Sequence, residues 1–386
     1  MREKVPGREF KPGGRRACRR AAPTPETAPT CQGFAGIARE CLICFRNELP
    51  IGASYLTSPH DARVRVSYAE GAGIRLGALM TQATRGRSAG IERDGGVFRL
   101  TYWEPDARLA RYVSGYHRYE VELAHGATCS DALFPGWTNL RFTEPAGAWA
   151  IRLGRRAVDP VPAQALFGPS SQVAYASGGS GAVTGAGLTP LGWTRLIGGD
   201  ASRHANRVVP LADVLGDDAG ILAERLGEGE PAEVFDSYFL GLLERSEPEP
   251  ASVAAVLDFL AAPGQCRVAD LGACTGLAPR ALLQVTKRHC GFPPKLLLRR
   301  ARFVAALTAM MGQRQGNWAR EVSGAGYFDQ SHFVRDCRFF LGRPLRDFMA
   351  APKTMMQLSM EIREQALGAP AQVLHRPPVS DRDAAA

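Results

Sequence analysis

The sequence predicts an α+β multidomain fold, in which a β-rich N-terminal part precedes an all-α C-terminal part. The chain has 386 residues, 45% hydrophobic and 22% charged, which is ordinary for a globular protein and sufficient for two domains. Short segments of β-branched and aromatic residues, separated by Gly, Pro and Asn, recur from about 90 to 205. From Leu211 onward the apolar residues recur with a helical period instead.

Residues 1–88 are predicted to be a disordered basic extension. Residues 1–20 hold eight basic and two acidic side chains, and residues 11–33 are rich in Pro, Gly, Arg, Ala and Thr. This composition buries too little apolar surface to offset the chain entropy lost on folding. Cys41 and Cys44 form a single CxxC without a second Cys or His pair at zinc-site spacing, so we expect free cysteines and no metal.

The cysteines and the apolar segments indicate the cellular compartment. No apolar stretch of signal-peptide length follows the basic start, and no stretch is long and apolar enough to span a bilayer. Nine cysteines at irregular spacing favour reduced thiols over a disulfide framework. The sequence therefore predicts a cytoplasmic protein without a membrane partner.

Residues 89–245 are predicted to form a sandwich or barrel that senses a ligand or dimerises. The expected strands are residues 97–103, 118–123, 139–142, 149–153 and 164–167. A short helix is expected at 109–116, because Leu109, Val113 and Tyr116 recur at helical spacing.

A glycine-rich stretch from Gly178 to Gly187 resembles a phosphate-binding loop only superficially. A dinucleotide site requires a long helix after its glycines, and here Pro190 and Gly192 follow, which break helices. The stretch is therefore predicted to be a flexible hairpin loop.

The remaining chain is predicted to be mainly helical. Two amphipathic helices are expected at 217–226 and 231–243, and the sequence SEPEP at 246–250 is the expected linker, because its two prolines prevent helix formation. Residues 251–350 are helical in pattern throughout. Residues 351–386 are predicted to be a flexible C-terminal tail.

The helical block contains an internal near-repeat. Its first copy consists of Ala269, Gly276, Gly291 and Pro293, and its second copy consists of Ala319, Gly326, Gly342 and Pro344. The spacings are seven, fifteen and two residues in the first copy, and seven, sixteen and two in the second. A small residue, a Gly at a sharp turn, and a helix closed by Gly and followed by Pro are typical of a helix-turn-helix unit.

Charge separates this helical block from the rest of the chain. Residues 264–350 carry fourteen basic and five acidic side chains, a net of +9 that alone equals the net charge of the whole chain. Residues 1–20 contribute +6, residues 351–386 contribute 0, and residues 21–263 therefore carry −6. This asymmetry is typical of a nucleic-acid-binding module attached to a different domain.

The repeat also carries a family resemblance. The stretches VADLGACTGLAPRALLQVTKRHCGFPPKLLLRRARFVAAL and WAREVSGAGYFDQSHFVRDCRFFLGRPLRDF resemble the two halves of the double helix-turn-helix domain of AraC/XylS transcription regulators. The segments RYVSGY, LFPGWTNLRF and LFGPSS resemble the cupin-like N-terminal domain of some members. The resemblance implies a cupin-like, β-rich N-terminal domain and an all-α double helix-turn-helix DNA-binding domain with two recognition helices joined by one long helix.

The sequence supports this geometry. Residues from Pro293 to Met311 can form a helix about 28 Å long, which approaches the roughly 34 Å between successive major grooves on one face of DNA. Its packing face includes Leu297, Arg300 and Phe303. In the second unit Asp329 is expected to cap the recognition helix.

Side-chain chemistry divides the candidate DNA contacts into two groups. Residues expected to read base edges in the major groove are Arg280, Leu283, Gln284, Lys287, Gln330, Ser331, His332 and Arg335. Residues expected to contact phosphates are Arg288, Lys295, Arg299, Arg338, Arg343 and Arg346. Arg302 is instead expected to pair internally with an acid such as Asp336.

The first unit departs from the family pattern at three positions. Ala278 stands where a capping Ser is usual, Gln284 where Arg is usual, and Thr286 where a core Phe is usual. Losing a cap costs about 1 kcal/mol, and a smaller core residue leaves volume for neighbours to fill. We expect weaker or less selective DNA binding by this unit.

The sequence therefore predicts a transcription regulator that binds promoter DNA, without a catalytic site or cofactor. Its expected partners are double-stranded DNA, RNA polymerase, an unidentified small-molecule effector and a second copy of the chain. One alternative is a cupin-like enzyme fused to a DNA-binding domain, but its N-terminal histidines, His117, His125 and His204, are widely spaced and lack an HxH pair. A second alternative is a helical domain that contacts polymerase rather than DNA.

Overall fold

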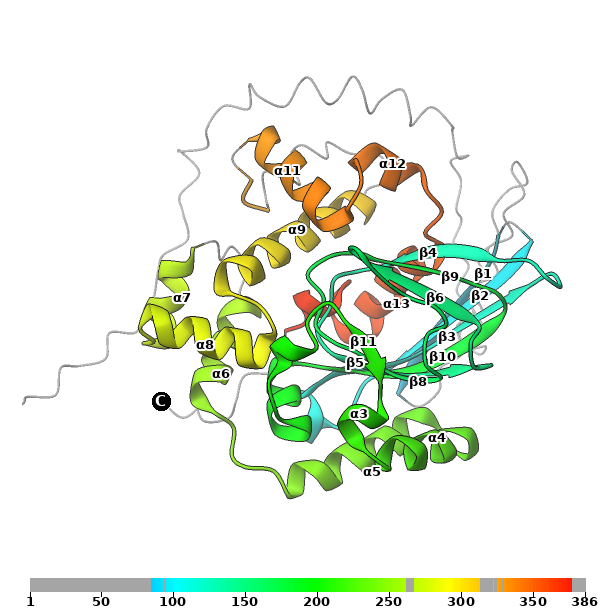
Figure 1. The fold of residues 1–386 in the computed structure, drawn as a ribbon, viewed down its shortest axis with the longest axis horizontal. Coiled ribbons are helices and arrows are strands. Elements are labelled where there is room, and N and C mark those ends of the chain that lie inside the picture. Colours follow the sequence, from blue (N-terminus) through cyan, green and yellow to red (C-terminus); the bar gives the residue numbers. More distant parts are fainter. Residues whose placement is uncertain are drawn as a thin grey trace, which may run out of the picture.

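The computed structural model describes residues 85–93, 95–261, 267–312, 322, 325–327 and 329–376. A β-sandwich fills one side of the molecule and a group of helices the other (Figure 1). The expectations for the basic extension and for Cys41 and Cys44 lie outside the described residues. The predicted boundary at residue 88 was late, because the first strand, β1, begins at Gly86.

Two antiparallel sheets form the β-rich part. The larger sheet has the strand order β1-β2-β3-β10-β5-β8-β11, and the smaller one has the order β4-β9-β6-β7. The strands of the larger sheet are β1 (Gly86–Arg93), β2 (Gly96–Trp103), β3 (Val113–Leu123), β10 (Gly181–Leu188), β5 (Asn139–Glu144), β8 (Gln164–Phe167) and β11 (Val208–Pro210). Those of the smaller sheet are β4 (Cys129–Leu133), β9 (Ala174–Gly178), β6 (Trp149–Leu153) and β7 (Arg156–Val158). All five predicted strands are confirmed.

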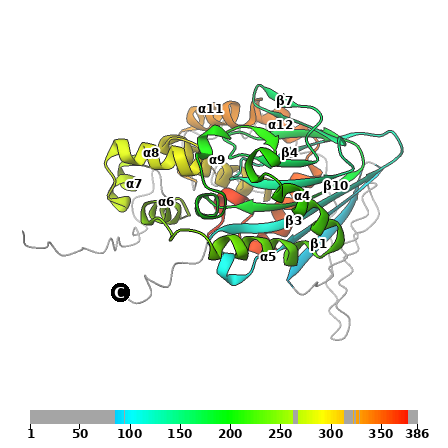
Figure 2. The same cartoon turned by 60° about the horizontal axis from the view of Figure 1, so that its bottom comes forward.

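The larger sheet is buried on both faces. Its outer face packs on helix α5 (Pro231–Glu244), where the Tyr116 ring stacks on Phe235 with centroids 5.1 Å apart. Helix α4 (Asp218–Glu228) packs beside α5 in the same cluster. Both helices follow the predicted ranges. Figure 2 shows α4 and α5 along one side of the sheet.

Two expectations in the β-rich part were wrong. Residues 109–116 do not form a helix: a single 3₁₀ turn, η1 (Ala107–Leu109), precedes β3, which begins at Val113. The glycine-rich stretch is largely strand β10, and only its first residues turn. A Cβ at Gly185 would lie 2.6 Å from Nε2 of His117, so glycine provides room for a neighbouring side chain.

Short helical segments connect the β-rich part to the linker. They are α2 (Pro190–Gly192), the π-helical turn η2 (Trp193–Ile197), the 3₁₀ turn η3 (Ala201–Arg203) and α3 (Ala212–Leu215). Residues 247–250 have no helix or strand, as expected for the linker. Arg111 and Tyr112 nevertheless donate hydrogen bonds to Glu249, so this segment is fixed to the β-rich part.

The helical part follows the linker. Its helices are α6 (Ala251–Ala261), α7 (Val268–Thr275), α8 (Pro279–Cys290), α9 (Pro294–Gly312), α11 (Gln330–Leu341) and α12 (Leu345–Ala350). The repeat glycines Gly276, Gly291, Gly326 and Gly342 all have φ between 66° and 85°. Their predicted role in left-handed turns is thereby confirmed.

The predicted flexible tail was wrong over most of its length. Helix α13 (Thr354–Leu367) and the 3₁₀ turn η4 (Gln372–Leu374) return to the β-rich part, and Leu358 and Ile362 pack on Leu100 and Tyr102 of β2. Asp131 of β4 accepts hydrogen bonds from the first backbone N–H groups of α13. The apolar face of α13 therefore forms part of the sandwich core, and Figure 1 shows α13 between the sheets.

One core joins the two parts of the chain. Trp137 and Val173 of the β-rich part belong to the same buried cluster as Phe303 of α9 and Phe340 of α11. None of the described helices is long and apolar enough to cross a membrane.

Candidate nucleic-acid interface

Helix α8 presents a single polar face to solvent. Arg280, Leu283, Gln284 and Lys287 are all exposed, and their spacing of three, four and seven residues places them on one side of the helix. Leu283, at 41%, is among the few large apolar side chains left exposed in the described part of the chain. An exposed leucine flanked by two cations suits contact with a base methyl beside phosphates.

The opposite face of α8 holds the helix in the core. Leu282, Thr286 and Cys290 are buried, and the Thr286 hydroxyl donates a hydrogen bond to the Leu282 carbonyl oxygen at 2.9 Å. That bond satisfies the hydroxyl, so threonine is tolerated where the family has phenylalanine. Ala278 makes no side-chain capping bond, in agreement with the predicted loss of the cap.

Helix α11 presents a second exposed face. Asp329 caps this helix as predicted and accepts a hydrogen bond from the His332 backbone N–H at 2.7 Å. Ser331, Arg335 and Arg338 are exposed at spacings of four and three residues, so they share one side of the helix. Gln330 is the first residue of α11.

The His332 side chain is less exposed than those of Ser331 and Arg335. Its side chain is 29% exposed, its Nε2 lies 3.9 Å from Oδ2 of Asp336, and its ring packs edge-on against Tyr327 with centroids 5.1 Å apart. These contacts orient the imidazole along the helix toward the core. Ser331 and Arg335 are therefore better placed for base contact than His332.

The phosphate assignment of Arg299 requires correction. Its Nε and Nη2 donate to Oδ1 of Asp336 at 3.0 and 2.6 Å, so it forms the internal ion pair that the sequence assigned to Arg302. Arg302 instead lies over the Tyr327 ring, 5.6 Å from the centroid. Arg299 and Arg302 lie almost one helical turn apart on α9, and sequence spacing does not decide which of them reaches α11.

Arg343 also differs from the expectation. Its guanidinium carbon lies 4.1 Å from the centroid of Tyr175 in β9, and the Tyr175 hydroxyl donates to the Leu341 carbonyl oxygen. This arginine therefore contacts the β-sandwich. The remaining phosphate candidates are all exposed: Arg288, Lys295, Arg338 and Arg346.

Helix α9 connects the two exposed faces. It has 19 residues and starts and ends one residue later than predicted, so its length is about 28 Å. Arg300 on α9 is fully buried, and its Nη1 donates to the carbonyl oxygens of Gly136 and Ser170 at 3.1 and 2.8 Å. Its guanidinium carbon lies 3.9 Å from the Trp137 ring centroid. Burial lowers the pKa of Arg300 to about 9.

Arg300 was predicted to belong to the packing face of α9, but its partners were not. Both acceptors are backbone carbonyl oxygens in loops of the β-rich part. The pattern of side chains in a sequence does not predict where such carbonyl groups lie. This contact ties the helix between the two exposed faces to the sandwich.

The N-terminal histidines do not converge. His117 is buried between the sheets, His204 packs against Trp193 with centroids 5.4 Å apart, and His125 is exposed in a turn. Among the described residues, no group of three or more His, Cys, Asp or Glu side chains is arranged to hold a metal ion.

The fold has a two-part architecture, in which a β-sandwich is joined through a shared core to a basic helical part, and two of its helices, α8 and α11, have exposed polar faces. No family model and no curated protein sequence matches the chain. Several solved structures are similar to it.

These solved structures include ToxT from Vibrio cholerae, at 9% identity and a TM-score of 0.33 over 58% of this chain and 97% of that chain. Wild-type ToxT with a bound unsaturated fatty acid matches at 10% identity and a TM-score of 0.33, over 58% of this chain and 95% of that one. The AraC-like transcriptional activator CuxR matches at 14% identity and a TM-score of 0.26, over 61% of this chain and 91% of that one. CuxR is described as AraC-like, and residues 251–350 resemble the AraC/XylS family. Identities and TM-scores this low carry no argument about function.

Proposed function

We propose that the protein is a sequence-specific DNA-binding transcription regulator of the AraC/XylS type, which places α8 and α11 in successive major grooves of a promoter. The observation that carries the proposal is the pair of exposed helix faces separated by α9. A helix about 28 Å long between them brings their separation close to the roughly 34 Å of one DNA turn.

The candidate DNA-contacting residues of these two helices divide by chemistry. Arg280 and Arg335 suit bidentate contact with guanine, and Gln284 and Gln330 suit adenine, whereas Leu283 suits the thymine methyl. Lys287, Ser331 and His332 complete the base-reading set. Arg288, Lys295, Arg338 and Arg346 are exposed cations around these faces and suit phosphate contact, which fixes register without reading sequence.

The β-rich part is proposed to control this DNA binding. Arg300 and the shared core connect α9 to the loops at Gly136 and Ser170, so a ligand that shifts those loops acts directly on the helix between the reading faces. RNA polymerase and a second copy of the chain are the proposed protein partners, as for other regulators of this type.

The proposal is tested by incubating the purified full chain with sheared genomic DNA of its source, and sequencing the retained fragments. We expect a small set of enriched sites upstream of genes. The logarithm of the affinity for one such site should fall linearly with the logarithm of the salt concentration. Lys and Arg side chains that bind phosphates release the counterions condensed on the DNA. Absence of enriched sites, or an affinity independent of salt, would contradict the proposal and favour a helical part that contacts polymerase.

A further inference from the structure

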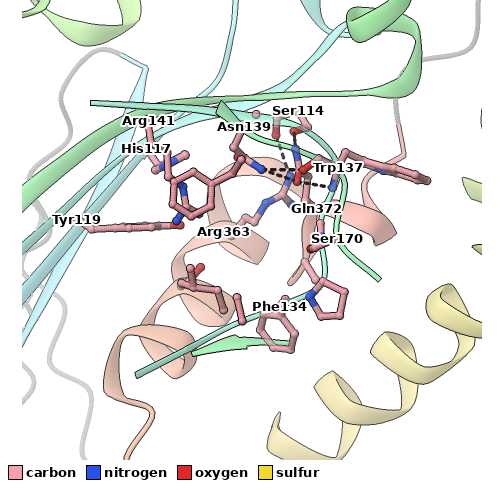
Figure 3. A pocket seen from close by; sticks show the side chains of 18 of the residues that line it. Ser114, His117, Tyr119, Phe134, Trp137, Asn139, Arg141, Ser170, Arg363 and Gln372 are labelled. Atoms are coloured by element: carbon pink, nitrogen blue, oxygen red, sulfur yellow. Dashed lines mark hydrogen bonds between the residues drawn. The ribbon is translucent and has the colours of Figure 1, made fainter. Parts of the chain in front are cut away.

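A cavity that is partly open to solvent lies inside the β-sandwich. Its volume is about 90 Å³, and its walls come from strands β2, β3, β5 and β8, from the loop at Phe134–Trp137, and from α13 and η4. Figure 3 shows His117, Tyr119, Arg141 and Arg363 gathered on one side of this space. The C-terminal segment is thus part of the wall, and the cavity is assembled from both ends of the described chain.

The charged side chains that line the cavity are all basic. Three arginines line it, Arg141, Arg207 and Arg363, and no Asp or Glu is among its lining residues. Buried cations are ordinarily paired with carboxylates, because an uncompensated charge in a low-dielectric interior is costly.

Among the described residues, neither Arg141 nor Arg363 has an anionic hydrogen-bond partner. Arg363 is 4% exposed and donates to neutral acceptors, the carbonyl oxygens of Ala369 and Ser114 at 2.7 and 2.8 Å. Arg141 lies 4.4 Å from the Phe167 ring centroid, and its Nε is buried without a hydrogen-bond partner. Burial lowers the pKa of both guanidinium groups, and only tyrosines counter it.

A third polar group in the cavity wall is also unsatisfied. His117 is 3% exposed, and its Nε2 is buried without a hydrogen-bond partner. Burial together with the nearby Arg141 and Arg363 holds the pKa of His117 well below its usual value, so this imidazole is neutral at physiological pH. The cavity therefore contains the buried cation of Arg363, the half-buried cation of Arg141 and an unpaired ring nitrogen.

The rest of the lining restricts the ligand. Phe134, Trp137, Leu153 and Phe167 provide apolar walls beside the arginines. The volume is smaller than the ~150 Å³ that accepts benzene in an engineered cavity. A compact ligand with one anionic end and a short apolar end satisfies both constraints.

We propose that this cavity binds a small aliphatic carboxylate, whose oxygens are held by Arg141 and Arg363 through charge-assisted hydrogen bonds. Such bonds are roughly twice as strong as neutral ones, and the planar guanidinium matches a carboxylate. The proposal rests on the proposed function only for the ligand's role as effector of DNA binding. Arg363 belongs to the segment that directly follows α12, so the ligand contacts the chain that leaves the helical part.

Calorimetric titration of the full chain tests this binding without DNA. Propionate is the probe, propionamide is its neutral isostere, and inorganic phosphate is the competing oxyanion, all at constant ionic strength. We expect one saturable site for propionate and at least tenfold weaker binding of the other two. Equal binding of propionate and propionamide, preference for phosphate, or no propionate binding would overturn the proposal.

Two variants separate a binding role from a structural one. Arg141→Met should weaken propionate binding at least tenfold, yet the unliganded variant should melt at the same or a higher temperature, because a half-buried cation without an anionic partner among the described residues has been removed. A purely structural arginine would lower the melting temperature when replaced and leave no selective loss of binding. Arg99→Met is the control, since Arg99 lies on β2 with a side chain 49% exposed and pairs with Glu122.

Comparing propionate binding with the enrichment of DNA sites distinguishes failure of this proposal from failure of the proposed function. If propionate binds but no DNA sites are enriched, the proposed function fails and the carboxylate site stands. If DNA sites are enriched and propionate does not bind, only the carboxylate site fails.

Discussion

Arg299 of α9 and Asp336 of α11 form an ion pair in which both guanidinium nitrogens, Nε and Nη2, donate to the same carboxylate oxygen at 3.0 and 2.6 Å. The Tyr327 hydroxyl donates to the other oxygen at 2.8 Å, and the Asp336 side chain is 1% exposed. This carboxylate therefore fixes the orientation of α11 relative to the long helix α9.

Replacing Arg299 with Ala should destabilise the helical part. The change leaves the buried Asp336 carboxylate with the Tyr327 hydroxyl as its remaining hydrogen-bond donor among the described residues, and breaking a buried ion pair costs about 3–5 kcal/mol. Because Arg299 is 30% exposed, we expect about 2–3 kcal/mol in urea unfolding. The exposed Arg346 is the control, and an equal effect of Arg346→Ala would contradict the structural role of the pair.

Arg335 and Arg338 should separate base reading from phosphate contact. Arg335→Ala should cost about 1–3 kcal/mol of affinity and relax discrimination at one base pair, whereas Arg338→Ala should weaken all sequences alike and reduce the salt slope by about 1. Binding to a site and its single-base variants over a salt series measures both effects. Arg225, exposed on α4, is the control, and the same pattern in both variants would refute the division of roles.

Substitution of Ile362 tests whether α13 packs on the β-rich part. This side chain is 4% exposed and packs on Leu100 and Tyr102. Truncation of a buried isoleucine to alanine costs about 2–5 kcal/mol of folding free energy. Ile362→Ala should therefore lower the free energy of unfolding of the β-rich part by that amount. Ile221, which is 52% exposed, should change it by less than about 0.5 kcal/mol, and equal changes would mean that α13 is not docked.

The buried histidines should make the protein acid-sensitive. Burial lowers the pKa of His117 well below 6.5, and that of His375 to about 4, so the unfolded chain binds protons first as the pH falls. Stability should be constant above pH 6.5 and decrease below it by about 1.4 kcal/mol per pH unit for each such histidine.

Unfolding midpoints measured between pH 7.5 and 5, roughly the range in which histidine titrates, check this expectation. His117→Gln should flatten the slope, while His125→Gln, at an exposed position, should leave it unchanged. An identical slope in wild type and His117→Gln would show that His117 is not kept neutral by the fold.

Local sequence signals predicted much of this fold. Strands such as Trp149–Leu153 and Gln164–Phe167 lie within their predicted bounds, because alternating β-branched and aromatic residues have few other stable arrangements. The repeat glycines likewise take left-handed turns. The capping of α11 by Asp329 also follows from a local rule.

The errors concern interactions between distant parts of the chain. Val113 and Tyr116 have helical spacing but lie in β3, because β10 pairs with both residues and β2 pairs with Tyr116 on the other side. Residues 351–386 are balanced in charge and suggest a tail, yet the apolar face of residues 354–367 completes the sandwich core. The cavity arginines Arg141 and Arg363 are 222 residues apart, and no local pattern predicts their proximity.

We propose that α8 and α11 read two adjacent major grooves, and a footprint of the full chain on an enriched site tests this most directly, when compared with footprints of Arg280→Ala and Arg335→Ala. We expect two protected segments about 10 base pairs apart, with protection lost at one segment in the first variant and at the other in the second. Loss of the same segment in both variants, or of neither, would contradict it.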